Sequence, residues 1–338
     1  MANRIKIGII SPSEIAFRRF MPAITKLSEN FEFVGLAIAS KEEWNGKYNE
    51  EIKEIELLKA RKFIDQYGGK VFFSYKELIT ASNVDAIYLP LPPGLHFKWA
   101  SLALKNKKHV LIEKPSTTKL EDTKKLICIA KENNLALHEN YMFIYHSQIE
   151  KIKELIDSKI IGDTRLIRAN FGFPKRAEND FRYNKELGGG ALLDCAGYPI
   201  RLMSYLLGDD IHVDASKLFF NEKDVDLYGS VQLSTSEQVA QIAYGMDNSY
   251  KCDIEIWGSI GTISTNRVFT APDSLEVDIN IKTNNDEKQI HLKKDDTFKK
   301  SIQTFLNAIN DENCRNIIFK NMENQMRLIE EVRENYVK

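Results

Sequence analysis

The first 140 residues alternate short β-branched and apolar runs with longer amphipathic stretches, and this alternation limits the possible fold more than any other feature of the chain. Strands are expected at residues 5–10, 31–39, 84–89, 109–112 and 135–138, with helices at about 14–27 and 120–133. Strands separated by helices predict a parallel, doubly wound sheet. We therefore expect an α/β fold whose first domain, residues 1–140, is of the Rossmann type.

The pattern changes in residues 141–338, where strands follow one another. They are expected at residues 164–173, 211–220, 228–233, 238–244, 251–257, 261–264 and 275–281, framed by helices at about 191–207 and 298–336. This predicts a second, α+β domain with a large, mainly antiparallel open sheet. A sheet with one solvated face often uses it for a second subunit, so we expect a homodimer or homotetramer formed through this domain.

Composition excludes several classes of partner. The chain has 338 residues with 47 basic and 48 acidic side chains, a net charge of −1, and so no field that would gather nucleic acid or an anionic membrane. The sequence has no apolar run of membrane-spanning length and no signal-peptide pattern, which favours a cytoplasmic protein. Four cysteines and six histidines lack ligand spacing, so no metal is expected.

A lysine follows the apolar run at 109–112 directly, in the tripeptide Glu113-Lys114-Pro115. Open α/β sheets bind ligands outside the carboxyl ends of their strands, so Lys114 should face a ligand crevice. Partial withdrawal from water lowers the pKa of an ammonium toward the range of proton exchange. Because X-Pro bonds adopt the cis form at modest cost, Pro115 offers a sharp turn that would hold the lysine inward.

The turn after the first strand carries serines where a dinucleotide fingerprint has glycines. Ser11 and Ser13 take the first two glycine positions and Ala16 the third, with Pro12 and Ile15 between them. Hydroxyls at a helix N-terminus can bind phosphate. The alternative is a plain helix start with Ser13 as its N-cap.

The end of the second strand offers Ser40 and Lys41 in place of the acid that usually binds the ribose of NAD. A hydroxyl beside a cation suits a 2′-phosphate, which favours NADP. Glu42 and Glu43 follow directly, and a small shift of the loop would bring either carboxylate to the ribose, so NAD also remains possible.

A second constellation lies in the helix expected at 191–207. Asp194 and Tyr198 are four residues apart, so a carboxylate and a phenol share one helical face behind the triple glycine at 188–190. The alternative is an exposed aspartate and a core tyrosine.

With these motifs in place, the chain resembles the Gfo/Idh/MocA family of oxidoreductases over nearly its whole length. The segments that carry the resemblance are residues 89–96, 108–115, 138–146 and 188–199. Phe181-Arg182-Tyr183 and residues 261–272 are most similar to the sugar-nucleotide 3-ketoreductases of deoxysugar biosynthesis. The resemblance implies an NAD(P)-binding Rossmann domain, a substrate-binding second domain whose sheet forms the oligomer interface, and an active-site lysine.

From the motifs and the resemblance we expect an NAD(P)-dependent oxidoreductase that transfers a hydride between nicotinamide and a ring carbon of a sugar or sugar nucleotide. Lys114 or Tyr198 would donate the proton and Asp194 would orient the substrate or the lysine. The cofactor-binding residues would be Ser11, Pro12, Ser13, Ile15, Ser40, Lys41, Leu89, Pro90, Leu91, His96, Glu113, Lys114, Asn140 and Arg182. For His96 a structural role is equally open.

Three alternatives remain at this point. One is a UDP-sugar 3-dehydrogenase that keeps its NAD tightly bound. The second is a dehydrogenase of free sugars or diols. The third is a redox-silent protein that senses a nucleotide, against which the joint presence of Lys114, Asp194 and Tyr198 argues.

Overall fold

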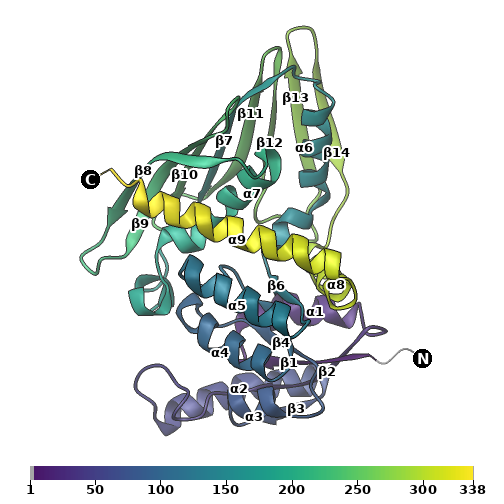
Figure 1. Cartoon of the computed structure of the whole chain (residues 1–338), viewed down its shortest axis with the longest axis vertical. Helices are drawn as coiled ribbons and strands as arrows, with labels where there is room; N and C mark the ends of the chain where they lie inside the picture. The colour runs from purple at the N-terminus through teal and green to yellow at the C-terminus, as the bar shows by residue number, and fades with distance from the viewer. Residues whose placement is uncertain (1–3, 338) are drawn as a thin grey trace. The chain divides into compact units, whose positions relative to one another are not determined.

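The computed structural model describes residues 4–337, and the chain divides into two compact units (Figure 1). The first comprises Met1–Thr117, Glu121–Asn140 and Phe298–Met322. The second comprises Thr118–Leu120, Tyr141–Thr297 and Glu323–Lys338. The expected domains of 1–140 and 141–338 differ from these units mainly at Phe298–Met322, because Ser301 there bonds to Asn140 and Arg315 bonds to Asn134. The end residues 1–3 and 338 of the two expected domains lie outside the described residues.

The first unit contains a six-stranded parallel sheet in the order β3-β2-β1-β4-β5-β6. Its strands are β1 (Ile5–Ile10), β2 (Phe31–Ala37), β3 (Lys70–Phe72), β4 (Ala86–Leu89), β5 (His109–Ile112) and β6 (Leu137–Glu139). The central strands are buried on both faces, as expected when helices cover a parallel sheet on either side. The doubly wound fold predicted from the sequence is confirmed.

Helices connect these strands. They are α1 (Met21–Thr25) after a π-helical turn at Ala16–Phe20, α2 (Glu50–Tyr67), α3 (Tyr75–Thr80), α4 (Pro93–Lys105) and α5 (Leu120–Glu132). Two helices from much later in the chain, α8 (Thr297–Asn310) and the beginning of α9 (Glu312–Glu334), also belong to this unit. In α5 the buried residues are Thr123, Leu126, Ile127 and Ala130, whose spacing forms one helical stripe. Asn49 caps α2 by accepting a hydrogen bond from the Ile52 amide at 2.8 Å.

The second unit is built on an eight-stranded sheet in the order β14-β13-β12-β11-β7-β10-β9-β8. Its strands are β7 (Thr164–Gly172), β8 (His212–Phe220), β9 (Asp226–Ser234), β10 (Val239–Gly245), β11 (Lys251–Gly258), β12 (Gly261–Asn266), β13 (Val277–Thr283) and β14 (Glu287–Leu292). Only the pairing of β7 with β10 is parallel among these described strands. The expected open, mainly antiparallel sheet is therefore confirmed, and β14 is an addition to it.

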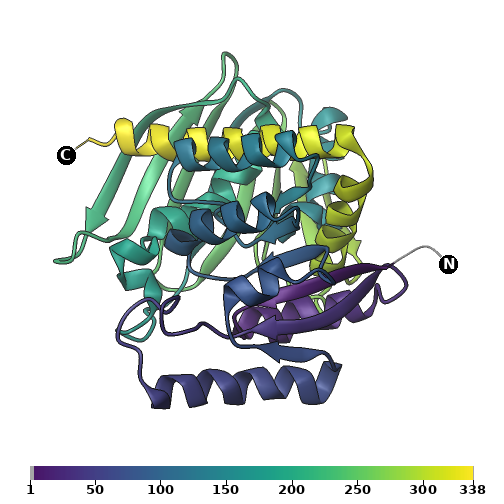
Figure 2. The same ribbon diagram turned by 60° about the horizontal axis from the view of Figure 1, so that its bottom comes forward.

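One face of this sheet is covered and the other is open. The strands alternate, so that in β9 Val231 and Leu233 are buried whereas Ser230 and Gln232 are exposed. The buried side chains pack against α6 (Ser147–Asp157), α7 (Gly197–Leu207) and the end of α9 (Figures 1 and 2). Short turns at Met142–Tyr145, Phe181–Tyr183 and Lys185–Leu187 and a π-helical segment at Leu192–Ala196 complete the unit.

The segment after α9 pairs with β8, which is the last strand at one edge of the sheet. Tyr336 forms a parallel bridge with Ser216, and the Val337 amide donates to the Ser216 carbonyl at 3.0 Å. The Ser216 hydroxyl donates to the Val332 carbonyl. Part of an otherwise open strand edge is thus covered by the chain's own end.

Candidate active site

Lys114 lies at the carboxyl end of β5, as expected, and is half-buried. The Lys114–Pro115 peptide bond is cis. Because the strands run in the order β2-β1-β4-β5-β6, the segments that follow them are neighbours along one edge of the sheet. That edge gathers all the expected cofactor residues except Arg182: Ser11, Pro12, Ser13 and Ile15 after β1, Ser40 and Lys41 after β2, Leu89, Pro90, Leu91 and His96 around the end of β4, Glu113 and Lys114 after β5, and Asn140 after β6.

Glu113, next to Lys114, is the centre of a partly buried hydrogen-bond network. Its Oε1 accepts from the Tyr88 hydroxyl at 2.7 Å and from the Asn140 amide at 2.6 Å. The Asn140 carbonyl oxygen in turn accepts from the Ser301 hydroxyl at 2.8 Å. Burial raises the pKa of Glu113, while these two donors and the Lys114 charge act in the opposite direction. Glu113 and Asn140 therefore make internal contacts that fix the backbone beneath Lys114.

His96 is fully buried and connects two of the expected cofactor segments. Its Nδ1 lies 2.8 Å from the Pro115 carbonyl oxygen and its Nε2 lies 2.6 Å from the Leu91 carbonyl oxygen. Desolvation lowers the pKa of His96 to about 4, although both carbonyl groups oppose that shift. Of the two roles left open by the sequence, these contacts support the structural one.

The serine-containing turn after β1 has features of both a glycine-type phosphate-binding turn and a plain capped helix start. Ser11 has a φ of 74°, the left-handed conformation that usually requires glycine, so it replaces a fingerprint glycine in backbone shape as well as in position. The Ser13 hydroxyl accepts from the Ala16 amide at 3.2 Å and acts as a helix cap. The Ser11 side chain is also hydrogen-bonded to that of Tyr75.

In the second unit, Asp194 is paired with Arg182. The Arg182 Nε donates to Asp194 Oδ2 at 2.6 Å, and its Nη1 donates to Asp180 Oδ1 at 3.1 Å. Burial lowers the pKa of Arg182, but the two carboxylates outweigh it and the net shift is upward. The sequence suggested neither this pair nor Asp180, because carboxylate and guanidinium lie twelve positions apart with no shared periodicity.

Two glycines allow the Arg182 segment to approach the helix that carries Asp194. The Gly190 amide donates to the Arg182 carbonyl at 3.0 Å. A Cβ at Gly189 would lie 2.4 Å from that same carbonyl oxygen and 2.8 Å from the oxygen of Asn184. Only a residue without a side chain fits this close approach.

Tyr198 follows in the first turn of α7 and is 8% exposed. Its ring centre lies 5.1 Å from that of Phe171, 5.4 Å from that of Tyr141, 5.5 Å from that of Phe143 and 6.2 Å from that of Phe269. These rings fix the orientation of the phenol. Lys114 belongs to the first unit and Tyr198, Asp194 and Arg182 belong to the second, so the meeting of the four side chains stays a prediction.

Residues 4–337 contain neither a metal-binding cluster nor a membrane-spanning helix. No group of three or more histidine, cysteine, aspartate or glutamate side chains there has an arrangement that would bind a metal ion. No helix in the same part of the chain combines the length and the apolar character needed to cross a bilayer.

Family models match both halves of the chain. Residues 14–141 match an oxidoreductase family with an NAD-binding Rossmann fold, and residues 149–264 match the GFO/IDH/MocA C-terminal domain. The first segment contains β2 to β6 of the first unit, and the second runs from α6 into β12 of the second unit.

Characterised relatives match most of the chain. The dTDP-3,4-didehydro-2,6-dideoxy-alpha-D-glucose 3-reductase of Actinomadura kijaniata is 36% identical over 310 residues, which cover 91% of this chain and 88% of that protein. The enzyme of the same name from Saccharopolyspora spinosa is 36% identical over 311 residues, covering 91% of this chain and 89% of the other.

A solved structure agrees. The 3-ketoreductase from Actinomadura kijaniata, in complex with NADP and TDP-benzene, superimposes with a TM-score of 0.90 at 32% identity, covering 99% of this chain and 98% of that one. Forms of that enzyme with a tyrosine changed to phenylalanine or a lysine changed to alanine have also been solved with the same two ligands. The family models and these relatives together show that the chain is an oxidoreductase and belongs to the GFO/IDH/MocA family.

Proposed function

We propose that this protein is an NADP-dependent reductase of a keto group at position 3 of a TDP-linked sugar. The observation that carries the proposal is the 36% identity, over 91% of the chain, to 3-reductases that act on a dTDP-linked didehydro sugar. The NADP and TDP-benzene complexes of a 3-ketoreductase with the same fold support both ligand classes.

The residues along the edge of the parallel sheet suit this cofactor. Ser11 has the backbone shape of a fingerprint glycine, so the turn after β1 can approach a pyrophosphate closely. Ser40 and the exposed Lys41 follow β2, where the 2′-phosphate of NADP is recognised in Rossmann domains. NADPH, when bound, supplies the hydride for the reaction.

The protein residues supply charge and a proton. The Lys114 ammonium stabilises the negative charge that develops on the carbonyl oxygen and lowers the pKa of a neighbouring phenol. Tyr198 or Lys114 then donates the proton to that oxygen. Arg182 neutralises Asp194 and holds the start of the Tyr198 helix, so we assign Asp194 a positioning role rather than direct contact with the substrate.

The test is steady-state reduction of a TDP-linked 3-keto sugar by NADPH. Lys114→Ala and Tyr198→Phe should each lower kcat by about 10²-fold or more while changing the NADPH dissociation constant by less than about threefold. Tyr205→Phe makes the same change at an exposed tyrosine of the same helix, and Lys119→Ala does so at an exposed lysine five residues further along the chain than Lys114. Both control variants should retain full turnover. Near-normal kcat in both active-site variants would contradict the assignment.

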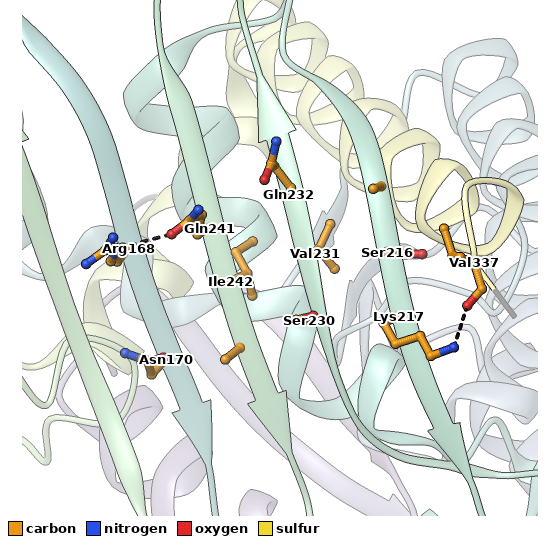
Figure 3. A pocket seen from close by; sticks show the side chains of 12 residues that line it. Arg168, Asn170, Ser216, Lys217, Ser230, Val231, Gln232, Gln241, Ile242 and Val337 are labelled. Atoms are coloured by element: carbon orange, nitrogen blue, oxygen red, sulfur yellow. Dashed lines mark hydrogen bonds between the residues drawn. The ribbon is translucent and has the colours of Figure 1, made fainter.

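We further propose that the open face of the eight-stranded sheet joins copies of this chain into a homodimer or homotetramer. The face has a shallow groove across β7, β10, β9 and β8 (Figure 3). The groove is lined by Arg168, Asn170, Ala215, Ser216, Lys217, Ser230, Val231, Gln232, Gln241, Ile242, Ala243 and Val337. Trp257, 55% exposed on β11 of the same face, adds an aromatic contact surface. An open sheet face of this size with an exposed tryptophan is typical of a surface that binds a partner.

A further inference from the structure

The loop after β2 is folded back on itself by Glu43. The amides of Glu43 and Trp44 both donate to the Ser40 carbonyl, at 3.1 and 3.0 Å, and close a tight turn. The Ser40 amide donates in the other direction, to Glu43 Oε2 at 2.9 Å. The Glu43 side chain therefore crosses the turn and fixes the backbone of Ser40, the residue before Lys41.

The same carboxylate binds the N-terminus of α3. Glu43 accepts from the Ser74 hydroxyl at 2.8 Å, the Tyr75 amide at 2.8 Å and the Lys76 amide at 3.0 Å. The Ser74 hydroxyl accepts from the Glu77 amide at 3.3 Å. The first three amides of α3 thus find acceptors, two of them on Glu43.

These contacts explain the ionisation of Glu43. Desolvation is the largest single influence and raises its pKa, but the hydrogen bonds from Ser40, Lys76, Tyr75 and Ser74 together outweigh it, so the pKa is lowered. Rotating the carboxylate toward a ribose would break four charge-assisted hydrogen bonds and leave helix amides without acceptors. Glu43 is therefore not available to bind the ribose hydroxyls as an NAD-binding acid would.

We infer that Glu43 is a positioning residue that sets the preference for NADP over NAD, an inference that rests on the proposed function. By anchoring the turn to α3, it removes its own charge from the cofactor and holds the Ser40 hydroxyl and the Lys41 ammonium where a 2′-phosphate is recognised. Glu42 is exposed, and its carboxylate accepts from its own backbone amide and from the Ser40 hydroxyl, the latter at 2.9 Å. Neither contact ties the turn to α3.

The inference predicts that loss of the Glu43 charge weakens NADPH binding, whereas simple electrostatics predicts the opposite. Removing a negative charge near a phosphate site should strengthen phosphate binding, whereas loosening the turn should weaken it. In Glu43→Gln, the NH2 group replaces one carboxylate oxygen and faces either the Ser40 and Tyr75 amides or the Lys76 amide. In both orientations a donor meets a backbone donor, so the anchor between the turn and α3 is weakened. Glu42→Gln makes the same change of charge one residue earlier and leaves the anchor intact.

The experiment measures dissociation constants of NADPH and NADH by fluorescence titration of the full chain. Glu43→Gln should weaken NADPH by about tenfold or more and NADH by less than about threefold, while Glu42→Gln should leave NADPH unchanged or tighter. Ser74→Ala removes one contact to Glu43 without changing charge, so it should reduce the preference for NADPH over NADH less than Glu43→Gln does. Ser74→Thr should restore that preference. Circular dichroism confirms that each variant is folded.

Each result has one meaning. Tighter or unchanged NADPH binding by Glu43→Gln, or an equal loss of NADPH and NADH, would overturn the inference and leave the proposed function intact. A wild-type protein that binds NADH as tightly as NADPH would overturn the cofactor assignment and the inference with it.

Discussion

Replacing Asp226 by asparagine should remove a pH-dependent part of the stability of the second unit. Asp226 begins β9, is 9% exposed, and its Oδ2 accepts from the Leu192 amide at 2.6 Å, at the start of the segment that carries Asp194. Desolvation raises its pKa from 3.8 to about 6, against the opposing effects of the Leu192 amide and the Arg333 charge. Asparagine keeps an acceptor oxygen for Leu192 but cannot ionise.

The direction of this pH dependence follows from proton binding. Between the unfolded pKa and the folded pKa, the folded state holds a proton that the unfolded state has lost, so the contribution of Asp226 to stability falls as pH rises. A shift of about two pKa units corresponds to about 3 kcal/mol in total, of which about 2 kcal/mol is lost between about pH 4.5 and 7.5. Relative to the wild type, Asp226→Asn should therefore gain about 2 kcal/mol over this range.

The assay is chemical denaturation followed by circular dichroism at a series of pH values, for wild type and variant. Asp224→Asn is the matched control, because Asp224 is an exposed carboxylate two residues away, paired with Lys185. It should follow the wild-type pH dependence. Parallel stability curves for the wild type and Asp226→Asn would refute the reasoning, because they would mean that Asp226 titrates alike in the folded and unfolded chains.

Two further substitutions test other features of the second unit. Gly189→Ala places a Cβ 2.4 Å from the Arg182 carbonyl oxygen, so the Arg182 segment must move. We expect kcat/KM for the keto sugar to fall about tenfold or more and the free energy of unfolding to fall by about 1–3 kcal/mol. Unchanged kinetics would contradict the close approach. Ala243→Arg puts a charge into the groove of Figure 3. If the proposed homodimer or homotetramer forms through this face, the variant should be monomeric in light scattering while NADPH binding persists, and a mass equal to that of the wild-type oligomer would exclude this face as the interface.

Most strands of the two sheets could be predicted because their signal is local, but the three-residue edge strand β3 was too short to give such a signal. The run at 109–112 is apolar throughout and β9 alternates, and each pattern has one simple structural meaning. The strand β14 was missed because its residues, Glu-Lys-Gln-Ile-His-Leu, are mostly exposed and offer no apolar face.

The position of a candidate site residue could be predicted only where the residue directly follows a strand. Lys114 follows directly from the end of β5, and Ser11 and Ser13 from the end of β1. The contacts of the acidic residues could not be predicted, since Asp194 binds Arg182, Asp226 binds Leu192 and Glu43 binds α3, all across gaps that carry no periodic signal. In each case a carboxylate that the sequence presents as a surface group or a ligand is held by the protein itself.

The hydrogen bond between Ser301 and Asn140 has a consequence for biosynthesis of the chain. Asn140 closes the parallel sheet and contacts Glu113, beside Lys114, but its carbonyl oxygen accepts from a helix made more than 150 residues later. A nascent or truncated chain that ends soon after β6 has every strand of the Rossmann sheet and still lacks the donor for a buried amide oxygen. The nucleotide-binding unit is therefore complete only once Phe298–Met322 has also been synthesised.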